Sequence, residues 1–519
     1  MIRAANETRR WWALGGITLA VLAVTLDATI LSVALPTLAG VFHASETDLQ
    51  WFSSAYLLVL AAAMLPAGLL GDRYGHKKVL LASLVLFGAG SAACAYASST
   101  GAFIGARVVL GAAGAGIVVM ALSAIAVLFT EEERPRAVGV WGAANFVAFP
   151  IGPILGGWLL SNYWWGWVFL INVPVALVGL VVALALVPES RAPQRPALDP
   201  VGTAASVAGL VGVTYGLIEA GQHGWTDSVA LGAMLAGLAI LVGFFLWEHR
   251  VGRQPGGQPL VDLGLFRSRA FTWGVILTAT AIMAMIGVLF TLPQYSQAVL
   301  GTDALGSGLR LLPLVGGLLI GILPAALLLR LVGAKLIAAF GFAVMGAGLL
   351  LGATTEVDST QGFILEWTAV VGVGLGLTFA TTASAAIAKL PRERSGVGAA
   401  VLQALQKVGG PFGAAVLGSV LASAYQAELD LGGLPPAVAK AVEDSVFGGL
   451  AVAGQLRSAA LAESVRAAFV HGMDVALLVS AGITLVGIVL ALAFLPGRSA
   501  ATEAAPEPER TGGPHAVAE

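Results

Sequence analysis

One acidic residue, Asp27, lies deep within an uncharged stretch that begins near Trp12 and reaches Pro36. In a helix, about nine residues separate Asp27 from Pro36, or roughly 14 Å. An ionised carboxylate at that depth of a membrane costs several kcal/mol, so burial favours the protonated form and lets Asp27 exchange a proton for a cation. The alternative is a protonated Asp27 that only hydrogen-bonds a neighbouring helix. We favour a functional role because intramembrane ionisable residues are usually functional.

Arg107 is the cation best placed to act with Asp27. It lies about six residues, or roughly 9 Å, inside another uncharged stretch, so its long side chain can reach the level of Asp27. An arginine at that level would set the proton affinity of the carboxylate. The alternative is an arginine that extends to the membrane interface without a coupling role.

The elements that must position these residues are membrane-spanning helices. The 519 residues are 58% hydrophobic and only 11% charged, with a mean hydropathy of +0.89, which excludes a soluble globular protein. About fourteen uncharged runs are long enough to cross a hydrocarbon core of roughly 30 Å, and in lipid they must be helices. The net charge of −2 gives no indication of a nucleic-acid partner.

Lys and Arg are distributed unevenly between alternate loops. Of the 27 basic residues, 21 fall in the set of loops that includes both termini, whereas the short loops of the other set contain none. Basic loops remain in the cytoplasm, so both termini are predicted to be cytoplasmic and the number of spans even.

The chain also contains an internal repeat with an offset of 258 residues. The matches lie in four separate patches and include prolines and charged residues. They pair Pro66 with Pro324, Lys77 with Lys335, Gly114 with Gly372, Arg134 with Arg392, Arg136 with Arg394, and Pro153 with Pro411. Paired spans run in the same direction, which indicates a parallel repeat of the kind found in transporters with two related halves.

The predicted fold is therefore an all-α integral membrane protein with two six-helix halves and two extra spans. Residues 1–187 form the N-terminal half, and 188–270 hold two inserted transmembrane helices and a cytoplasmic loop. Residues 271–496 form the C-terminal half, with a long extracellular loop at 423–472. Residues 497–519, which are acidic and bear Pro and Gly, are predicted to be a disordered cytoplasmic tail.

Several motifs resemble one known family over residues 10 to 495. The segments concerned are Leu26–Pro36, Gly68–Lys78, Ile151–Gly157, Phe169–Pro174 and Ala441–Gly449. They are similar to signatures of the major facilitator superfamily, and of its fourteen-span drug:proton antiporters in particular (QacA/EmrB-like). The resemblance implies two halves that rock about a central cavity, and it matches Arg107 to an arginine that assists proton coupling.

The resemblance also implies a set of gating residues. Asp72, in the loop after the second span, would pair with Arg73, Arg134 or Arg136 to hold one conformation. The glycines of the fifth span would let the halves move. The predicted gating residues are Gly68, Asp72, Arg73, Gly75, Lys77, Arg134, Arg136, Gly152, Pro153, Gly156 and Gly157. Membrane topology alone could explain the loop, and ordinary small-residue packing could explain the glycines.

Polar or aromatic residues on spans that should face the centre are candidates for the wall of a substrate cavity. They are Tyr56, Asn145, Phe146, Phe149, Tyr295 and Gln403. Packing or lipid contact is an equally open explanation for each.

These observations predict a proton-coupled efflux antiporter that exports amphipathic, often cationic, drugs or antibiotics by alternating access. The alternative is a transporter of a lipid or of a specific endogenous metabolite on the same fold. No phosphate-binding loop or metal-ligand spacing is found, and Cys94 is the only cysteine, so we expect no cofactor, no metal and no enzymatic activity. The expected setting is a bacterial cytoplasmic membrane, where the protein would act as a monomer with protons, lipids and the small-molecule substrate as partners.

Overall fold

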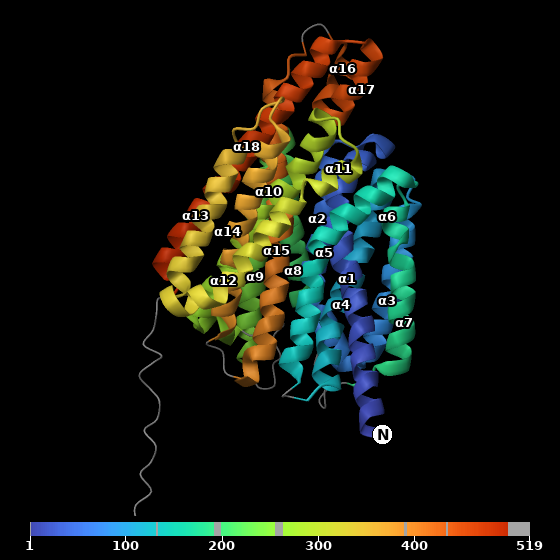
Figure 1. Cartoon of the computed structure of the whole chain (residues 1–519), viewed down its shortest axis with the longest axis vertical. Coiled ribbons are helices and arrows are strands. Elements are labelled where there is room, and N and C mark those ends of the chain that lie inside the picture. The colour runs from blue at the N-terminus through green and yellow to red at the C-terminus, as the bar shows by residue number, and fades with distance from the viewer. Residues whose placement is uncertain are drawn as a thin grey trace, which may run out of the picture.

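The computed structural model of the chain describes residues 2–130, 133–190, 199–254, 263–388, 392–431 and 434–496. Within these ranges every regular element is a helix (Figure 1). The first seven helices are α1 (Ile2–Phe42), α2 (Glu46–Tyr74), α3 (His76–Ala95), α4 (Thr100–Leu128), α5 (Arg134–Asn162), α6 (Trp167–Leu170) and α7 (Asn172–Leu186).

Two long helices, α8 (Pro200–His223) and α9 (Ser228–Gly252), follow and pack against each other. The rest of the chain forms the 3-10 helix η1 (Leu263–Arg267), α10 (Arg269–Gln294), the π-helix η2 (Tyr295–Val299), α11 (Ala304–Leu309), α12 (Leu312–Val332), α13 (Ala334–Gly352), α14 (Gln361–Ala388), α15 (Arg392–Glu428), α16 (Pro436–Asp444), α17 (Val446–Leu456) and α18 (Ala459–Phe494).

Eleven helical segments of the described chain are long and apolar enough to cross a membrane, and the bent helix α2 brings the number to as many as twelve. Two further long helices, α5 with 29 residues and α15 with 37, are described only in part at the level of side chains and are not among these. The predicted all-α membrane bundle is thus confirmed, and the number fourteen stays a prediction.

Large apolar side chains on the outside of the bundle agree with a lipid environment. Leu323 is 80% exposed, Leu235 66% and Val181 64%. In water each square ångström of such surface would cost about 25 cal/mol, whereas in hydrocarbon it costs nothing comparable.

Local sequence explains where helices begin and end. Ser45 starts α2 with a capping box, in which its hydroxyl accepts from the Asp48 amide at 3.2 Å and the Asp48 carboxylate accepts from the Ser45 amide at 3.0 Å. Gly75 both ends α2 and starts α3, and its φ of 110° lies in a region that favours glycine. The turn between the second and third spans therefore needs a single residue.

The two halves meet at the end of the bundle that carries α16 and α17, which we call the capped end; the chain's N-terminus lies at the opposite end (Figure 1). Gln297 in η2 donates to the Val33 carbonyl of α1 at 3.2 Å, and the Ser161 hydroxyl of α5 donates to Asp303 at 3.2 Å. Gly157 of α5 lies so close to the backbone of α11 that an added methyl group would come within 2.6 Å of the Ala304 carbonyl oxygen. Backbones can approach so closely only where the side chain is missing.

Helix α8 lies against both α2 and α15, and so beside both halves. Its Leu217 carbonyl accepts from the Ser419 hydroxyl at 2.7 Å, and its Gly221 carbonyl accepts from Ser423 at 2.9 Å. Toward α2, the rings of Tyr215 and Trp51 lie 6.5 Å apart.

Candidate functional site: a sealed carboxylate and an apolar pocket

The structure brings Asp27 and Arg107 together inside the N-terminal half. Asp27 on α1 is 2% exposed and Arg107 on α4 is completely buried. Nη1 of Arg107 donates to Oδ2 of Asp27, and Nε donates to the Phe52 carbonyl of α2 at 3.1 Å. The pair is therefore held by three helices and is almost completely buried in this conformation.

A third side chain completes the shell of the carboxylate. Asn172 is the first residue of α7, immediately after the break that separates α6 from α7, and its Nδ2 donates to Oδ1 of Asp27 at 3.0 Å. Both carboxylate oxygens thus accept a hydrogen bond, one from a cation and one from an amide. Asn172 is itself buried.

Tyr56 supports the arginine from the other side. The guanidinium carbon of Arg107 lies 4.3 Å from the centre of the Tyr56 ring, a cation–π distance, while the Tyr56 hydroxyl donates to the Val24 carbonyl of α1 at 2.8 Å. Nη2 of Arg107 is buried without a hydrogen-bond partner. The guanidinium therefore depends on Asp27 for charge compensation.

This arrangement makes the ionisation of Asp27 and the position of Arg107 interdependent. A buried ion pair is stable only as a pair, because removal of one partner leaves an uncompensated charge that costs about 3–5 kcal/mol. A proton on Asp27 would neutralise the carboxylate in the same way as the guanidinium does. The geometry thus allows an exchange between Arg107 and a proton as the partner of Asp27.

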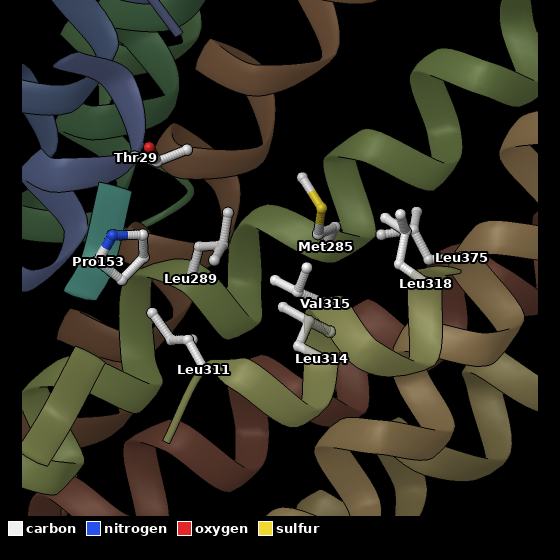
Figure 2. Close-up of a pocket in the computed structure, with 9 residues that line it drawn as sticks. All are labelled: Thr29, Pro153, Met285, Leu289, Leu311, Leu314, Val315, Leu318 and Leu375. Atoms are coloured by element: carbon white, nitrogen blue, oxygen red, sulfur yellow. The ribbon is translucent and has the colours of Figure 1, made fainter. Parts of the chain in front are cut away.

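A small pocket, with a cavity volume of about 20 Å³, lies between the two halves (Figure 2). Thr29 of α1 and Pro153 of α5 line it from the N-terminal half, and the other walls come from the C-terminal half. Those walls are Met285, Leu289, Leu311, Leu314, Val315, Leu318 and Leu375. Thr29 follows Asp27 by two residues, so the pocket and the sealed carboxylate share one short stretch of α1.

The loop between α2 and α3 is fixed to the end of α7 and the residues that follow it. The His76 amide donates to the Ser190 carbonyl at 2.8 Å, and Lys77 Nζ donates to the Leu184 carbonyl at 2.8 Å. Asp72 accepts from His76 Nε2 at 3.0 Å, and Arg73 lies over the ring of Tyr74 at 5.8 Å. The side chains of Arg134 and Arg136, the other predicted partners of Asp72, lie outside the described part of the structure.

The predicted gating glycines of α5 lie along its contacts with α1 and α11. Side chains of Thr29 and Ile30 fill the space beside Gly152 and Gly156, and Gly157 faces α11. The carbonyl of Pro153 lies against Gly308, at the end of α11. On α2, a methyl group added at Gly68 would lie at ordinary contact distance from the Val119 side chain.

The predicted cavity residues are placed differently from the pocket. Tyr56 and Tyr295 are completely buried, and the Tyr295 hydroxyl donates to the Glu356 carbonyl at 2.8 Å. Neither is among the pocket-lining residues. The side chains of the other four candidates lie outside the described residues; they are Asn145, Phe146, Phe149 and Gln403.

The sequence did not indicate Asn172 or the aliphatic pocket wall as parts of a site. Asn172 had one usable signal, since it is a lone amide within an apolar span. The leucines of the pocket had none, because leucine is equally common in packed and lipid-facing positions. Within the described ranges, no group of three or more His, Cys, Asp or Glu side chains could hold a metal ion.

A multi-span helical bundle with two halves, a buried ion pair inside one of them and a pocket between them points to a membrane transporter. Comparison with known families agrees. Residues 17–414 match the family model of the Major Facilitator Superfamily, so the chain belongs to that superfamily. The superfamily predicted from the motifs is thereby confirmed, and its fourteen-span drug:proton antiporter branch stays a prediction.

Curated relatives match nearly the whole chain. The tetracenomycin C resistance and export protein of Streptomyces glaucescens is 33% identical over 93% of this chain and 91% of its own. The multidrug efflux pump LfrA of Mycolicibacterium smegmatis is 32% identical over 93% of this chain and 97% of the LfrA chain. The puromycin resistance protein pur8 of Streptomyces alboniger is 30% identical over 96% of this chain and 94% of the pur8 chain.

Solved structures share the fold at low sequence identity. A bacterial homologue of the human lysosomal transporter Spinster, in an inward-facing and unoccupied conformation, superposes with a TM-score of 0.66 at 14% identity, covering 93% of this chain and 96% of that one. A D-xylose–proton symporter superposes with a TM-score of 0.59 at 15% identity, covering 94% of this chain and 98% of the symporter chain.

Proposed function

We propose that this protein exports amphipathic drugs or antibiotics from the cytoplasm in exchange for protons, by alternating access. The carrying observation is the buried Asp27 carboxylate, which accepts hydrogen bonds from Arg107 and Asn172; in the proposed exchange, a proton takes the place of Arg107. Relatives named for antibiotic resistance and export, at 30% to 33% identity over nearly the whole chain, support the choice of substrate class.

In the proposed cycle, opening of the capped end admits a proton to Asp27 and releases Arg107. Opening of the opposite end lets the proton leave, and Arg107 pairs with the carboxylate again. The present structure, with Asp27 and Arg107 paired and the halves in contact at the capped end, would follow proton release. Each proton that moves down one pH unit supplies about 1.4 kcal/mol.

The proposed orientation places the capped end outside a bacterial cytoplasmic membrane and both termini in the cytoplasm. The uneven distribution of Lys and Arg supports it. The ion pair lies within one N-terminal half, so a monomer holds every group that the proposed coupling needs.

The test uses inside-out vesicles with an acidified lumen and a pH-sensitive dye. Addition of a transported substrate should drive protons out of the lumen in the wild-type protein. Asp27→Asn keeps the size of the side chain and removes the titratable group, so substrate-dependent proton release should fall to background. Asp358→Asn, at an exposed loop position, is the matched control and should behave as wild type.

Protein amount and melting temperature must be measured for each variant, because Asp27→Asn leaves Arg107 buried without a counter-charge. Proton-driven efflux that is unchanged in Asp27→Asn, at equal amounts of folded protein, would eliminate the assignment. Transport of a lipid or of one endogenous metabolite, with no efflux of any drug in a broad panel, would favour the alternative predicted from the sequence.

A further inference from the structure

The residues that line the pocket between the halves indicate the charge of a ligand that could bind there. Eight of its nine described lining residues are apolar, and the ninth is Thr29. The Thr29 hydroxyl lies 3.1 Å from the Leu26 carbonyl and 3.2 Å from the Thr25 carbonyl, so it donates within its own helix. The described wall therefore presents no free donor and no charge to a ligand.

Asp27 does not supply the missing charge. Residues i and i+2 of an α-helix point to different sides, and here Thr29 faces the pocket while Asp27 faces Arg107 and Asn172 inside the N-terminal half. The carboxylate is 2% exposed and both its oxygens are engaged. A ligand in the pocket cannot reach it in this conformation.

A cation would therefore lose its hydration in the pocket without compensation. Cationic ligands are normally held by a carboxylate or by the face of an aromatic ring, and no described lining residue provides either. Met285 and the branched side chains of Leu289, Leu314 and Leu318 instead suit an apolar surface, and the flexible thioether can adapt to ligands of different outline.

We infer that this pocket selects uncharged, largely apolar small molecules rather than cations. The inference rests on the export function proposed above and narrows its substrate class. It has an electrical consequence. Exchange of one proton for a neutral molecule moves one positive charge per cycle, so a membrane potential should add about 2.3 kcal/mol per 100 mV to the driving force, whereas exchange for a monovalent cation would gain nothing from the potential.

Two fluorescent probes test the inference in proteoliposomes that contain the purified full-length protein. Nile red is uncharged and ethidium is a permanent cation. We expect proton-driven transport of Nile red to be at least about tenfold faster than that of ethidium, a difference of about 1.4 kcal/mol in the barrier. Imposing a membrane potential at constant pH difference should accelerate Nile red transport.

A charge introduced into the wall should reverse the preference. Leu289→Glu places a carboxylate in the pocket and should raise ethidium transport and lower Nile red transport. Leu289→Gln introduces a side chain of the same shape as glutamate but without its charge. It separates the effect of charge from that of polarity and should not gain ethidium transport. Val315→Glu, on another helix, is the second variant if Leu289→Glu does not fold.

The outcomes separate the inference from the proposed function. Preferential transport of ethidium by the wild-type protein, abolished by Asp27→Asn, would overturn the inference and leave proton-coupled export in place. Nile red transport that ignores the potential, or carboxylates in the wall that gain no ethidium transport, would also overturn it. Transport of neither probe, with no proton release for any substrate, would remove the proposed function and the inference with it.

Discussion

At Asp27, one carboxylate joins three helices, because its oxygens accept from Arg107 on α4 and from Asn172 on α7. The arginine in turn stacks on Tyr56 of α2. Any movement of these helices relative to one another would change the hydrogen bonds of the carboxylate. This arrangement suits a site that must respond to the conformation of the helix bundle.

We expect Arg107→Gln to destabilise the protein more than the double variant Asp27→Asn with Arg107→Gln. The single change leaves a buried, uncompensated carboxylate and should cost about 3–5 kcal/mol, whereas the double change leaves a neutral amide pair. Melting temperatures in detergent provide the measurement. Lys440→Gln, at an exposed position in α16, is the control and should have little effect. A double variant no more stable than Arg107→Gln would contradict the dependence of each charge on the other.

At the residue level, the sequence predicted the depth of Asp27 and the reach of Arg107, because charges stand out within apolar runs. It did not predict Asn172 as the third partner, since 145 residues separate it from Asp27 and only the break between α6 and α7 aims it inward. The pairing of Asp72 with His76 was also not predicted; it depends on the single-residue turn at Gly75.

At the scale of elements, α5 and α11 cross in close contact at the capped end. Gly157→Leu should push these backbones apart and favour the conformation that is open at this end. The measurement is the rate at which a membrane-impermeant maleimide labels Val33→Cys, a completely buried position at the contact with Gln297. We expect a rise of about tenfold, which corresponds to ~1.4 kcal/mol.

The control for this prediction is Gly316→Leu in α12, where nothing lies within 4 Å of an added methyl group. It should leave labelling of Val33→Cys unchanged. The native Cys94 is buried and serves as the background reference. Equal labelling in the Gly157→Leu and wild-type backgrounds would show that this crossing does not control the capped end.

The turn between α2 and α3 permits a second prediction at this scale. Gly75→Ala adds a methyl group at a φ of 110°, where the methyl group meets the Glu189 carboxylate. Backbone strain of this kind costs of order 1–3 kcal/mol, so the melting temperature and the transport rate should both fall. Gly101→Ala, in the first turn of α4 with open space around it, should change neither. Combining Gly75→Ala with Glu189→Ala should recover only the part caused by the contact.

Element boundaries were the least predictable feature of the chain. Residues 423–472, expected as an outer loop, include α16, α17 and the first part of α18, which starts at Ala459. The nine-residue helix α16 and the eleven-residue helix α17 are too short to cross a membrane. Long apolar runs in the sequence therefore do not reveal them. Ser445 and Ser458 accept from the amides of Gly448 and Leu461 and so cap α17 and α18.

At the scale of the whole molecule, the placement of basic residues predicts the orientation in the membrane. A reporter that is active only in the cytoplasm should function when fused to the C-terminus, and one that needs export should not. The same export-dependent reporter, inserted before α16 at the capped end, should be active. The opposite pattern would invert the proposed direction of transport, since the capped end would then face the cytoplasm.

The overall architecture was the most predictable level, because hydropathy, charge distribution and the repeat all act over long stretches and tolerate local errors. The pocket was not predictable, because its walls come from helices far apart in the sequence; Thr29 and Leu375, for example, both line it. Only the packing of the two halves decides which leucines meet there.

The place of α8 determines which helices would move together in the proposed alternating access. The Ser419 hydroxyl has one proton and lies 2.7 Å from the Leu217 carbonyl of α8 but 3.4 Å from Gln50 of α2, so its stronger bond joins α8 to α15. Ser423 adds a second bond of the same kind. The boundary between the two moving bodies would then run between α8 and α2. Helices α8 and α9 would move with the C-terminal half, so the two moving bodies would differ in mass.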